Sequence, residues 1–308
     1  MERRKRIEEK RTYTYHYKQS DSQRIQDYLI QEYRYSSRLL RQVKKNGGIF
    51  KNDKPVWATD PLKKGDNLRI ILPEETVDVS PNYGRLDILY EDDEVLIVNK
   101  NKNCVTHQTK NHQENTLANY IADYWLKNEE KSKIRFINRL DRDTTGIVVV
   151  AKNKYVHHFI QSQMEDTTKT YVAMVEGYPQ SETGLIDAPI ARLEENSIQR
   201  VVSPKGKRAL TEYRVVENYD DGSSLLRLRL LTGRTHQLRV HLQHIDCPII
   251  GDPLYNTLGN KAPIDRQALH AETIALTLPK KGRIEVFAPL KSDMITLRKL
   301  LIEGDKCE

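Results

Sequence analysis

The sequence predicts an α+β fold: a mixed, largely antiparallel sheet flanked by helices, preceded by a small N-terminal α/β unit. The expected strands outnumber the expected helices and do not alternate strictly with them, which distinguishes the fold from a doubly wound one. The β-branched run at residues 147–150 is typical of a buried strand. A length of 308 residues exceeds one typical domain, so we expect two.

Composition narrows the class of protein. Hydrophobic residues make up 38% of the chain, enough for a core in the larger domain. No run reaches the ~20 apolar residues of a membrane span and no apolar segment follows the basic start, so we expect a cytoplasmic protein without membrane contact. The net charge of +7 favours a polyanionic partner. Cysteine spacing argues against a disulfide framework or structural zinc, and predicts incidental thiols at Cys104, Cys247 and Cys307.

The first quarter of the chain predicts a basic tail and a small domain. Residues 1–12 are expected to form a frayed tail that touches phosphate non-specifically, because they are rich in basic side chains and lack an apolar period. The small domain spans residues 13–76, with a helix over 23–32 and a second helix that Ser36 caps and Gly47 ends. Short strands are expected around 49–50, 55–57 and 67–72.

The second of these helices has two faces. Leu39 and Val43 point toward a core, while a basic stripe is formed by Arg38, Arg41 and Lys45. The run SSRLLRQVKKNGGI, followed by a hairpin and KKGDNLRIIL, resembles the S-four-type RNA-binding domain. The resemblance implies that the stripe docks on RNA phosphates with an affinity that falls with salt; an ordinary solvated helix face is the alternative.

A turn-rich linker is expected at residues 77–84, and a catalytic domain at 85–308. Helices are predicted after Asn115 or Thr116, after Asn153, after Gly233 and over 292–302. Strands are predicted at 86–90, 95–99, 170–175, 209–216, 224–231, 272–278 and 283–287.

Three motifs carry the chemistry. The segment NRLDRDTTG at 138–146 places four alternating charges directly before the buried strand. By themselves these charges would be typical of a solvated turn. KTY at 169–171 and LTGRTHQLR at 231–239 follow it. In this order they resemble the motifs of the RluA-type family of pseudouridine synthases, whose central motif is HRLDxxTSG, and LYEDDEVLIVNK at 89–100 resembles the first motif of that family.

The resemblance implies the isomerisation of uridine to pseudouridine, a reaction that needs no cofactor or metal. It assigns to Asp141 the ionised carboxylate, acting either as nucleophile or as a base on the neighbouring sugar carbon. It assigns to Arg234 the bidentate cationic partner that keeps this carboxylate charged in a closed pocket. Tyr171 is implied to stack on the uracil, with its phenol near the proton that leaves carbon five.

Basic residues around the motifs are expected to contact RNA phosphates: Arg139, Arg142, His236 and Arg239. The chain departs from the family pattern at three positions. Asn138 replaces a histidine, and Asn101 and Asn103 stand where a proline and a glycine are usual. These changes put any imidazolium role and the local loop shape in question.

Three hypotheses follow. The first is an RNA pseudouridine synthase, acting as a monomer on structured RNA, with large-subunit ribosomal RNA favoured over transfer RNA by the domain pairing. The second is a non-catalytic RNA-binding or assembly factor that keeps the fold. The third, a glycosidase with Asp141 and Asp143 as its carboxylate pair, is weakened because the sequence shows no evidence of an acidic groove.

Overall fold

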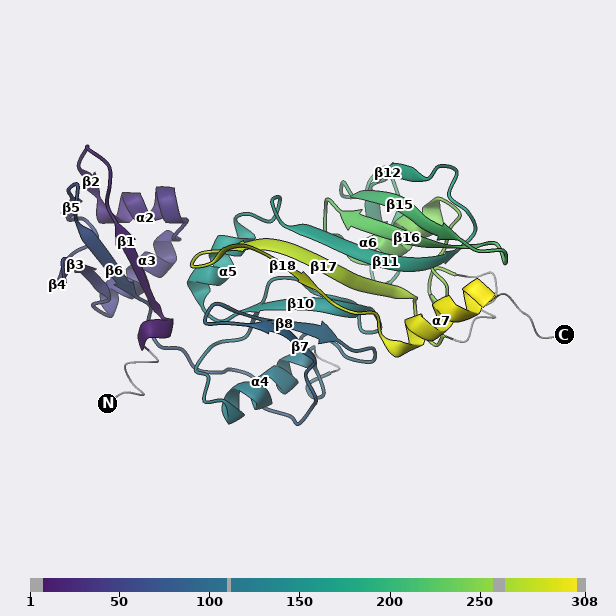
Figure 1. Ribbon diagram of the computed structural model, residues 1–308, viewed down its shortest axis with the longest axis horizontal. Coiled ribbons are helices and arrows are strands. Elements are labelled where there is room, and N and C mark those ends of the chain that lie inside the picture. The colour runs from purple at the N-terminus through teal and green to yellow at the C-terminus, as the bar shows by residue number, and fades with distance from the viewer. Residues whose placement is uncertain (1–7, 110–111, 257–263, 304–308) are drawn as a thin grey trace.

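A ten-stranded sheet forms the body of the larger domain in the computed structural model, which describes residues 8–109, 112–256 and 264–303 (Figure 1). In spatial order its strands are β12 (Thr183–Asp187), β15 (Leu210–Asn218), β16 (Ser223–Leu230), β11 (Thr168–Glu176), β17 (Leu269–Leu278), β10 (Thr145–Ala151), β8 (Val95–Lys100) and β7 (Ile88–Glu91), with β18 (Gly282–Phe287) on β17 and β9 (Arg135–Phe136) on β10. Among these described strands only β10 and β17 pair in parallel. The sheet is therefore mixed and largely antiparallel, as predicted.

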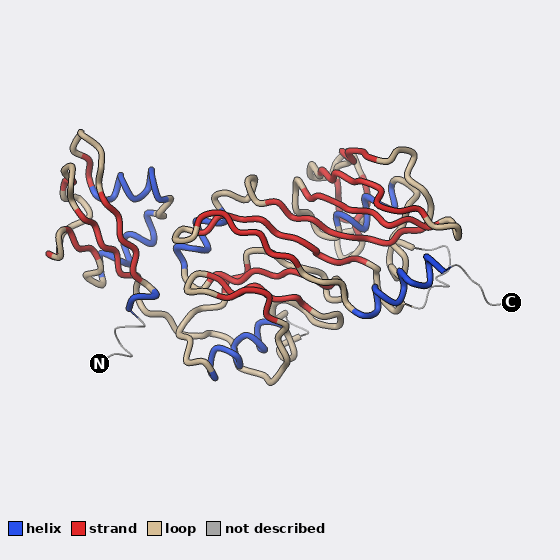
Figure 2. Tube along the Cα trace, viewed as in Figure 1, coloured by secondary structure: helices blue, strands red, loops and turns tan. Residues whose placement is uncertain are grey.

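Both faces of the sheet centre are buried. Side chains of a strand alternate between faces, and Leu96 of β8 lies in the core with α4 (Leu117–Lys127), whereas Ile97 lies in the core with α5 (Lys154–Gln161). Figure 2 shows the strands running along the larger domain with the helices outside them. The first of these two cores also receives residues from the two remaining helices, α6 (Gln237–His244) and α7 (Ser292–Glu303). Burial on both faces explains the unbroken apolar run of β10.

Side-chain caps begin the helices where the sequence predicts them. The Thr116 hydroxyl accepts a hydrogen bond from the Asn119 N–H, and Asn119 Oδ1 accepts the Thr116 N–H in return, which forms a capping box. The Asn153 side chain accepts from Val156 N–H. Of the two predicted caps for α4, the structure selects Thr116.

The small N-terminal unit is an antiparallel sheet with two helices. Its strands follow the order β1 (Thr12–His16), β6 (Asn67–Ile71), β3 (Ile49–Lys51), β4 (Lys54–Pro55), beside the short pair β2 (Gln23–Arg24) and β5 (Pro61–Leu62). The helices are α2 (Ile25–Tyr33) and α3 (Ser37–Lys45), and Ser36 caps α3 as predicted. Strand β4 ends at Pro55, so the strand predicted over 55–57 is too long because the chain turns at Trp57.

Part of the predicted tail is ordered. Residues 1–7 lie outside the described residues, but Arg11 donates from Nη1 to the Leu72 carbonyl at 2.8 Å and Thr12 begins β1. The prediction of a frayed segment up to residue 12 is wrong for this end of it, because β1 pairs with β6 along its whole length.

An aromatic and polar cluster joins the two units. The Tyr155 ring of α5 stacks on Tyr35 at 4.1 Å and meets Tyr13 edge-on at 4.7 Å. The Tyr13 hydroxyl donates to Glu94 at 3.1 Å, and the Lys280 N–H donates to the same carboxylate at 2.9 Å. Burial raises the pKa of Glu94 to about 7. The small unit thus shares a buried interface with the catalytic domain.

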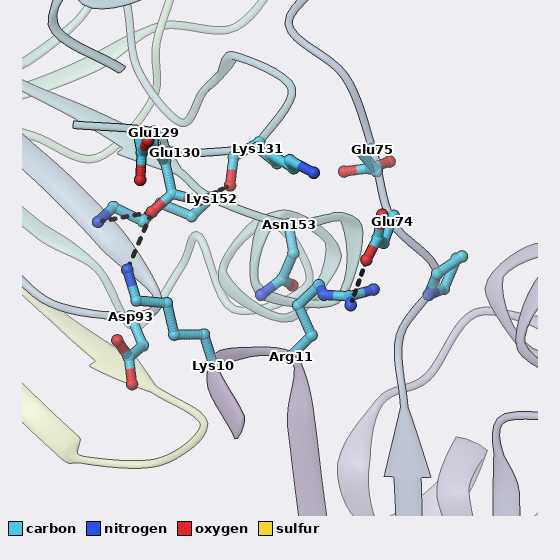
Figure 3. A pocket seen from close by; sticks show the side chains of 12 residues that line it. Lys10, Arg11, Glu74, Glu75, Asp93, Glu129, Glu130, Lys131, Lys152 and Asn153 are labelled. Atoms are coloured by element: carbon cyan, nitrogen blue, oxygen red, sulfur yellow. Dashed lines mark hydrogen bonds and ion pairs between the residues drawn. The ribbon is translucent and has the colours of Figure 1, made fainter. Parts of the chain in front are cut away.

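Ion pairs surround this interface (Figure 3). Lys10 and Lys152 both contact Glu130, at 3.4 and 3.7 Å, while Arg11 pairs with Glu74 at 3.1 Å. Residues 73–87, which include the predicted linker, contain neither helix nor strand. The Asn119 side chain donates to the Ser80 carbonyl at 2.8 Å, which holds this stretch along α4.

No described helix combines the length and the apolar character needed to cross a membrane. Cys104 and Cys247 are buried free thiols, and Cys307 lies outside the described residues. A hairpin that the sequence did not predict, β13 (Ile190–Arg192) and β14 (Arg200–Val202), lies between β12 and β15 in the chain.

Candidate active site

Asp141 lies in the turn that leads into β10, where three strands converge. Gly146, at φ 111°, brings β10 against β17: a Cβ atom here would lie 2.3 Å from the Ala271 carbonyl oxygen, so only glycine fits. On the other side of β17, Ala271 pairs with Tyr171 of β11. The loop of Asp141 and the side chain of Tyr171 therefore belong to the same part of the sheet.

Buried side chains hold the backbone on both sides of Asp141. The buried Lys100 donates from Nζ to three carbonyls, those of Asn101, Cys104 and Arg142, at 3.0, 2.8 and 2.8 Å. Thr106 Oγ1 donates to the Leu140 carbonyl at 3.1 Å. Burial lowers the pKa of Lys100 to about 8, against the attraction of Cys104, Asp143 and Asp141. The residues before and after Asp141 are thus tied to the protein interior.

Arg239, in the first turn of α6, is the cation beside Asp141. Its Nη1 lies 3.2 Å from Asp141 Oδ2, while Nε and Nη2 bind the two oxygens of Asp252 at 2.6 and 2.7 Å. Asp252 is fully buried, and its Oδ1 also accepts the N–H groups of Leu254 and Tyr255. Burial alone would lower the pKa of Arg239, but its bonds to Asp252 and the attraction of Asp141 raise it. The guanidinium is a fixed, permanently charged partner for Asp141.

The predicted pairing of Arg234 with Asp141 is wrong. Arg234 is exposed in the turn before α6, and its Nε donates to the Arg208 carbonyl at 3.0 Å. The predicted phosphate role of Arg239 also disagrees with the structure, because its side chain is only 6% exposed and binds two carboxylates. The turn reverses the two roles: the buried arginine faces Asp141, and the exposed one faces solvent.

His236 is the N-cap of α6 rather than a helix residue, with a left-handed backbone at φ 56°. The Tyr255 hydroxyl accepts the Arg200 N–H at 2.9 Å and lies 2.9 Å from His236 Nδ1. We therefore assign the hydroxyl proton of Tyr255 to a hydrogen bond that it donates to His236 Nδ1. The neutral ring then carries its proton on Nε2, 3.8 Å from Asp141 Oδ2. Burial lowers the pKa of His236 despite the attraction of Asp141. A neutral imidazole therefore faces Asp141, instead of the phosphate contact predicted for His236.

Tyr171 is 6% exposed, and a register shift between Thr170 and Tyr171 interrupts its pairing with β17. Burial, reinforced by the charge of Asp141, raises its pKa well above the ordinary range, so the phenol keeps its proton. Within the described part of the chain, no group forms a hydrogen bond with this hydroxyl. Its hydrogen-bonding capacity is available to a bound molecule.

The other predicted RNA contacts lie at the surface. Arg139 and Arg142 are exposed, and Arg142 Nε donates to Asp143 Oδ2 at 2.9 Å. Asp143 also accepts the Asn103 N–H at 3.1 Å. The Asp143 carboxylate is thus used in hydrogen bonds that hold the loop. It is not available to Asp141 as the second catalytic carboxylate, which removes support for the glycosidase hypothesis. The stripe Arg38, Arg41 and Lys45 is exposed on α3, with Leu39 and Val43 buried beneath it.

This geometry suits covalent or base catalysis at an electron-poor sugar carbon. The Asp141 side chain is 31% exposed and accessible to a bound molecule, whereas its cationic partner is buried. The neutral His236 and the protonated Tyr171 are the other ionisable groups described above beside it. An ionised carboxylate next to an aromatic ring can attack or deprotonate a sugar while the ring contacts the attached base.

Comparison with known proteins agrees with this geometry. Residues 94–244 match the family model described as RNA pseudouridylate synthase. The chain is 42% identical over 241 residues to a Bacillus subtilis (strain 168) protein called uncharacterized RNA pseudouridine synthase YhcT, covering 77% of this chain and 79% of that protein. The chain belongs to the RluA-type RNA pseudouridine synthases.

Other members of the family support the assignment. Ribosomal large subunit pseudouridine synthase D of Escherichia coli (strain K12) is 36% identical over 245 residues, which cover 74% of each chain. The solved structure of human RNA pseudouridylate synthase domain containing 4 superimposes with a TM-score of 0.57 at 25% identity, covering 70% of this chain and 92% of that one.

Two of the three departures from the pattern of the pseudouridine synthases, Asn103 and Asn138, have local explanations, whereas nothing in the structure explains Asn101. Asn103 has a left-handed backbone at φ 55°, which asparagine tolerates better than most residues, so it serves where a glycine is usual. Asn138 bridges two backbone groups of β10: its amide donates to the Ile147 carbonyl and its oxygen accepts the Val149 N–H, both at 2.9 Å. Asn138 thus fastens the motif to the sheet by uncharged hydrogen bonds.

Two residues of this synthase site escaped the sequence reasoning: Asp252 and Tyr255. Both come from the segment after α6, whose described residues form no helix or strand and match none of the motifs considered. The available signal was the charged Asp252 between the apolar run 248–250 and Pro253, since a carboxylate beside a buried segment needs a cation.

Proposed function

We propose that the protein isomerises uridine to pseudouridine in structured ribosomal RNA. The observation that carries the proposal is the contact between Asp141 and the buried Arg239, beside a protonated Tyr171. The ribosomal target is supported by relatives named as ribosomal large subunit pseudouridine synthase D.

The residues divide the reaction among them. Asp141 either attacks the anomeric carbon or removes a proton from the neighbouring sugar carbon, and the bond from the base nitrogen to the sugar breaks. The detached uracil turns and joins the sugar through carbon five, and this step either displaces Asp141 from the anomeric carbon or returns the proton to the neighbouring sugar carbon. The proton on carbon five then leaves, and the freed base nitrogen takes up a proton. Tyr171 contacts the ring of the flipped uracil, and its phenol lies near the proton that leaves. Arg239 stabilises the charge of Asp141 before the attack or proton removal, and again when the carboxylate is released.

The N-terminal unit serves as an S-four-type RNA-binding domain in this proposal. Its support is α3, which presents Arg38, Arg41 and Lys45 to solvent and contains no acidic residue. In this proposal the protein acts as a monomer in the cytoplasm, where ribosomal RNA is found.

Pseudouridine mapping tests the proposal. The protein is incubated separately with unmodified ribosomal and transfer RNA, and Asp141→Asn is the control, since the amide keeps the shape but cannot supply the carboxylate. We expect new pseudouridine in ribosomal RNA with the natural chain and none with the variant. Transfer RNA as the only product would refute the target. A folded, RNA-binding protein that modifies neither would establish the non-catalytic assembly factor instead.

A further inference from the structure

Trp57 is a large aromatic side chain that the fold leaves in solvent. It is 63% exposed, whereas the other tryptophan of the chain, Trp125, is fully buried. The indole of Trp57 lies outside the buried core of the small unit as described. Its neighbours in the unit bury their aromatic rings, as Tyr13, Tyr28 and Tyr35 do. The exposure of Trp57 is therefore exceptional for this unit.

The backbone around Trp57 is held without help from the indole. The Asp60 carboxylate accepts the Trp57 N–H at 3.0 Å, and the Asp60 N–H donates to the Trp57 carbonyl at 3.0 Å. The carbonyls of Ala58 and Asp60 then accept the first N–H groups of α2, those of Gln26 and Ile25. The turn caps the helix through main-chain atoms and Asp60 alone, so the ring has no evident part in folding.

A cation lies over the ring of Trp57. Lys44 Nζ lies 5.3 Å from the centroid of the Trp57 ring, a distance at which a cation and an aromatic face attract. Lys44 belongs to α3, whose exposed side also carries Arg41 and Lys45. With Lys44 at one face and 63% of the residue exposed, the rest of the ring is open to a ligand.

We propose that Trp57 is a stacking platform for an unpaired RNA base, next to a duplex whose phosphates contact the basic side of α3. This rests on the proposed function, and adds to it the class of RNA that the small unit recognises: a junction between paired and unpaired nucleotides. An open aromatic face beside a row of cations, without acidic side chains on the helix, is the combination that binds single-stranded nucleic acid. Stacking is indifferent to base identity, so the site selects RNA shape rather than sequence.

The test uses two probes, an RNA hairpin with a blunt end and the same hairpin with an unpaired extension. Because Trp125 is buried, fluorescence changes on binding report on Trp57, and Trp57→Phe supplies the background emission. We expect the extended hairpin to quench the full-length protein and the blunt one to leave its emission largely unchanged. No quenching by the extended hairpin would overturn the proposal.

Two substitutions separate stacking from mere apolarity. Trp57→Phe keeps an aromatic face and should retain most of the affinity for the extended hairpin, whereas Trp57→Leu should weaken it by about 5- to 150-fold. Both variants should bind the blunt hairpin as tightly as the natural chain does, and both should have the unfolding temperature of the natural chain. If the leucine variant bound the extended hairpin as tightly as the natural chain does, the platform would be refuted, and the indole would be left to a protein partner.

Pseudouridine formation at saturating RNA distinguishes this inference from the proposed function. Trp57→Leu should keep the chemical rate there, since Trp57 belongs to a different unit from Asp141. A natural chain that shows quenching but forms no pseudouridine would contradict the proposed function and support the platform. If the leucine variant lost the chemical rate at saturating RNA, Trp57 would affect the reaction itself, which contradicts a role confined to binding.

Discussion

Arg239 contacts Asp141 at 3.2 Å, although the sequence favoured Arg234, which lies five residues earlier in the same motif and directly follows the turn glycine Gly233. The left-handed backbone of His236 turns the chain between the two arginines. Arg234 remains in the exposed turn and Arg239 enters the buried side of α6. Sequence spacing alone could not decide between them, because only the turn determines which one points inward.

The two arginines form a matched pair for mutagenesis. Arg239→Lys keeps a charge but loses the fork that spans Asp141 and Asp252, so we expect the single-turnover rate to fall about a hundredfold or more. Arg234→Lys should change the rate by about twofold or less, as expected of an exposed cation. Rates are measured on saturating ribosomal RNA, with unfolding curves as a check on folding. The opposite order of effects would return the catalytic role to Arg234.

Asp252 positions Arg239 from behind. Asp252→Asn removes the carboxylate that binds two nitrogens of the buried guanidinium and leaves the partly exposed Asp141 as its counter-charge, so we expect a loss of up to about 3–5 kcal/mol in unfolding free energy and a slower reaction. Asp265→Asn is the control, because Asp265 also pairs with a cation, Lys102, but is 68% exposed. It should cost less than about 1 kcal/mol. Urea unfolding measures the loss of unfolding free energy in both variants. Equal losses would show that the buried ion pair of Asp252 stabilises the fold no more than the exposed one of Asp265.

Tyr171→Phe separates the ring of this residue from its hydroxyl. The phenylalanine ring can still contact the uracil, so RNA affinity should be unchanged, while removal of the carbon-five proton should slow. Substrate deuterated at carbon five should therefore react more slowly than unlabelled substrate in the variant. Tyr171→Leu lacks the ring as well as the hydroxyl, so its RNA affinity should fall in addition to its rate. An unaltered rate in the phenylalanine variant would exclude the phenol from proton removal.

Glu94 makes stability depend on pH. Burial raises its pKa from 4.5 to about 7, so the folded protein holds a proton that the unfolded chain releases between these values. Stability should thus fall as pH rises through this window, by up to roughly 3 kcal/mol. Glu94→Gln keeps one oxygen to accept the Lys280 N–H, its amide nitrogen can donate to the Tyr13 hydroxyl, and it should remove this slope. Unfolding at about pH 5 and about pH 8 measures it. The same slope in both proteins would place its origin elsewhere.

The basic stripe of α3 should act on binding alone. Replacing Arg38, Arg41 and Lys45 together by alanine should weaken RNA binding and lower the salt slope by about 0.9 per lost duplex phosphate contact, or about 0.7 for single strands. The chemical step at saturating RNA should survive, since Asp141 and Tyr171 belong to the other domain. Affinity is measured against salt beside the single-turnover rate. Unchanged binding would make the stripe an ordinary solvated face.

Local signals in the sequence predicted local structure well. Ser36 and Asn153 cap their helices because a short polar side chain needs only the N–H groups of the next turn. The buried β10 was visible in its β-branched run. The hairpin of β13 and β14 was not predicted, because three-residue strands carry too little periodicity.

The site was predictable only in part, since its contacts join distant segments. Asp141 and Tyr171 stood in motifs, and the structure brings their segments together through Gly146 and Ala271. Asp252 lies 111 positions after Asp141, and nothing in the intervening chain indicates that one guanidinium binds both. Such a three-residue arrangement follows from tertiary packing.

The shared interface of the two domains has a consequence for synthesis on the ribosome. The chain emerges from its N-terminus, so Tyr13 and Tyr35 are made long before Tyr155 and Lys280, with which they complete their cluster. Until then the small domain exposes an aromatic surface beside its basic helix. In a nascent chain paused in this interval, a chaperone or nearby RNA can cover the exposed aromatic surface. The surface can be buried in its own interface only after the segment between β17 and β18, which contains Lys280, has been synthesised.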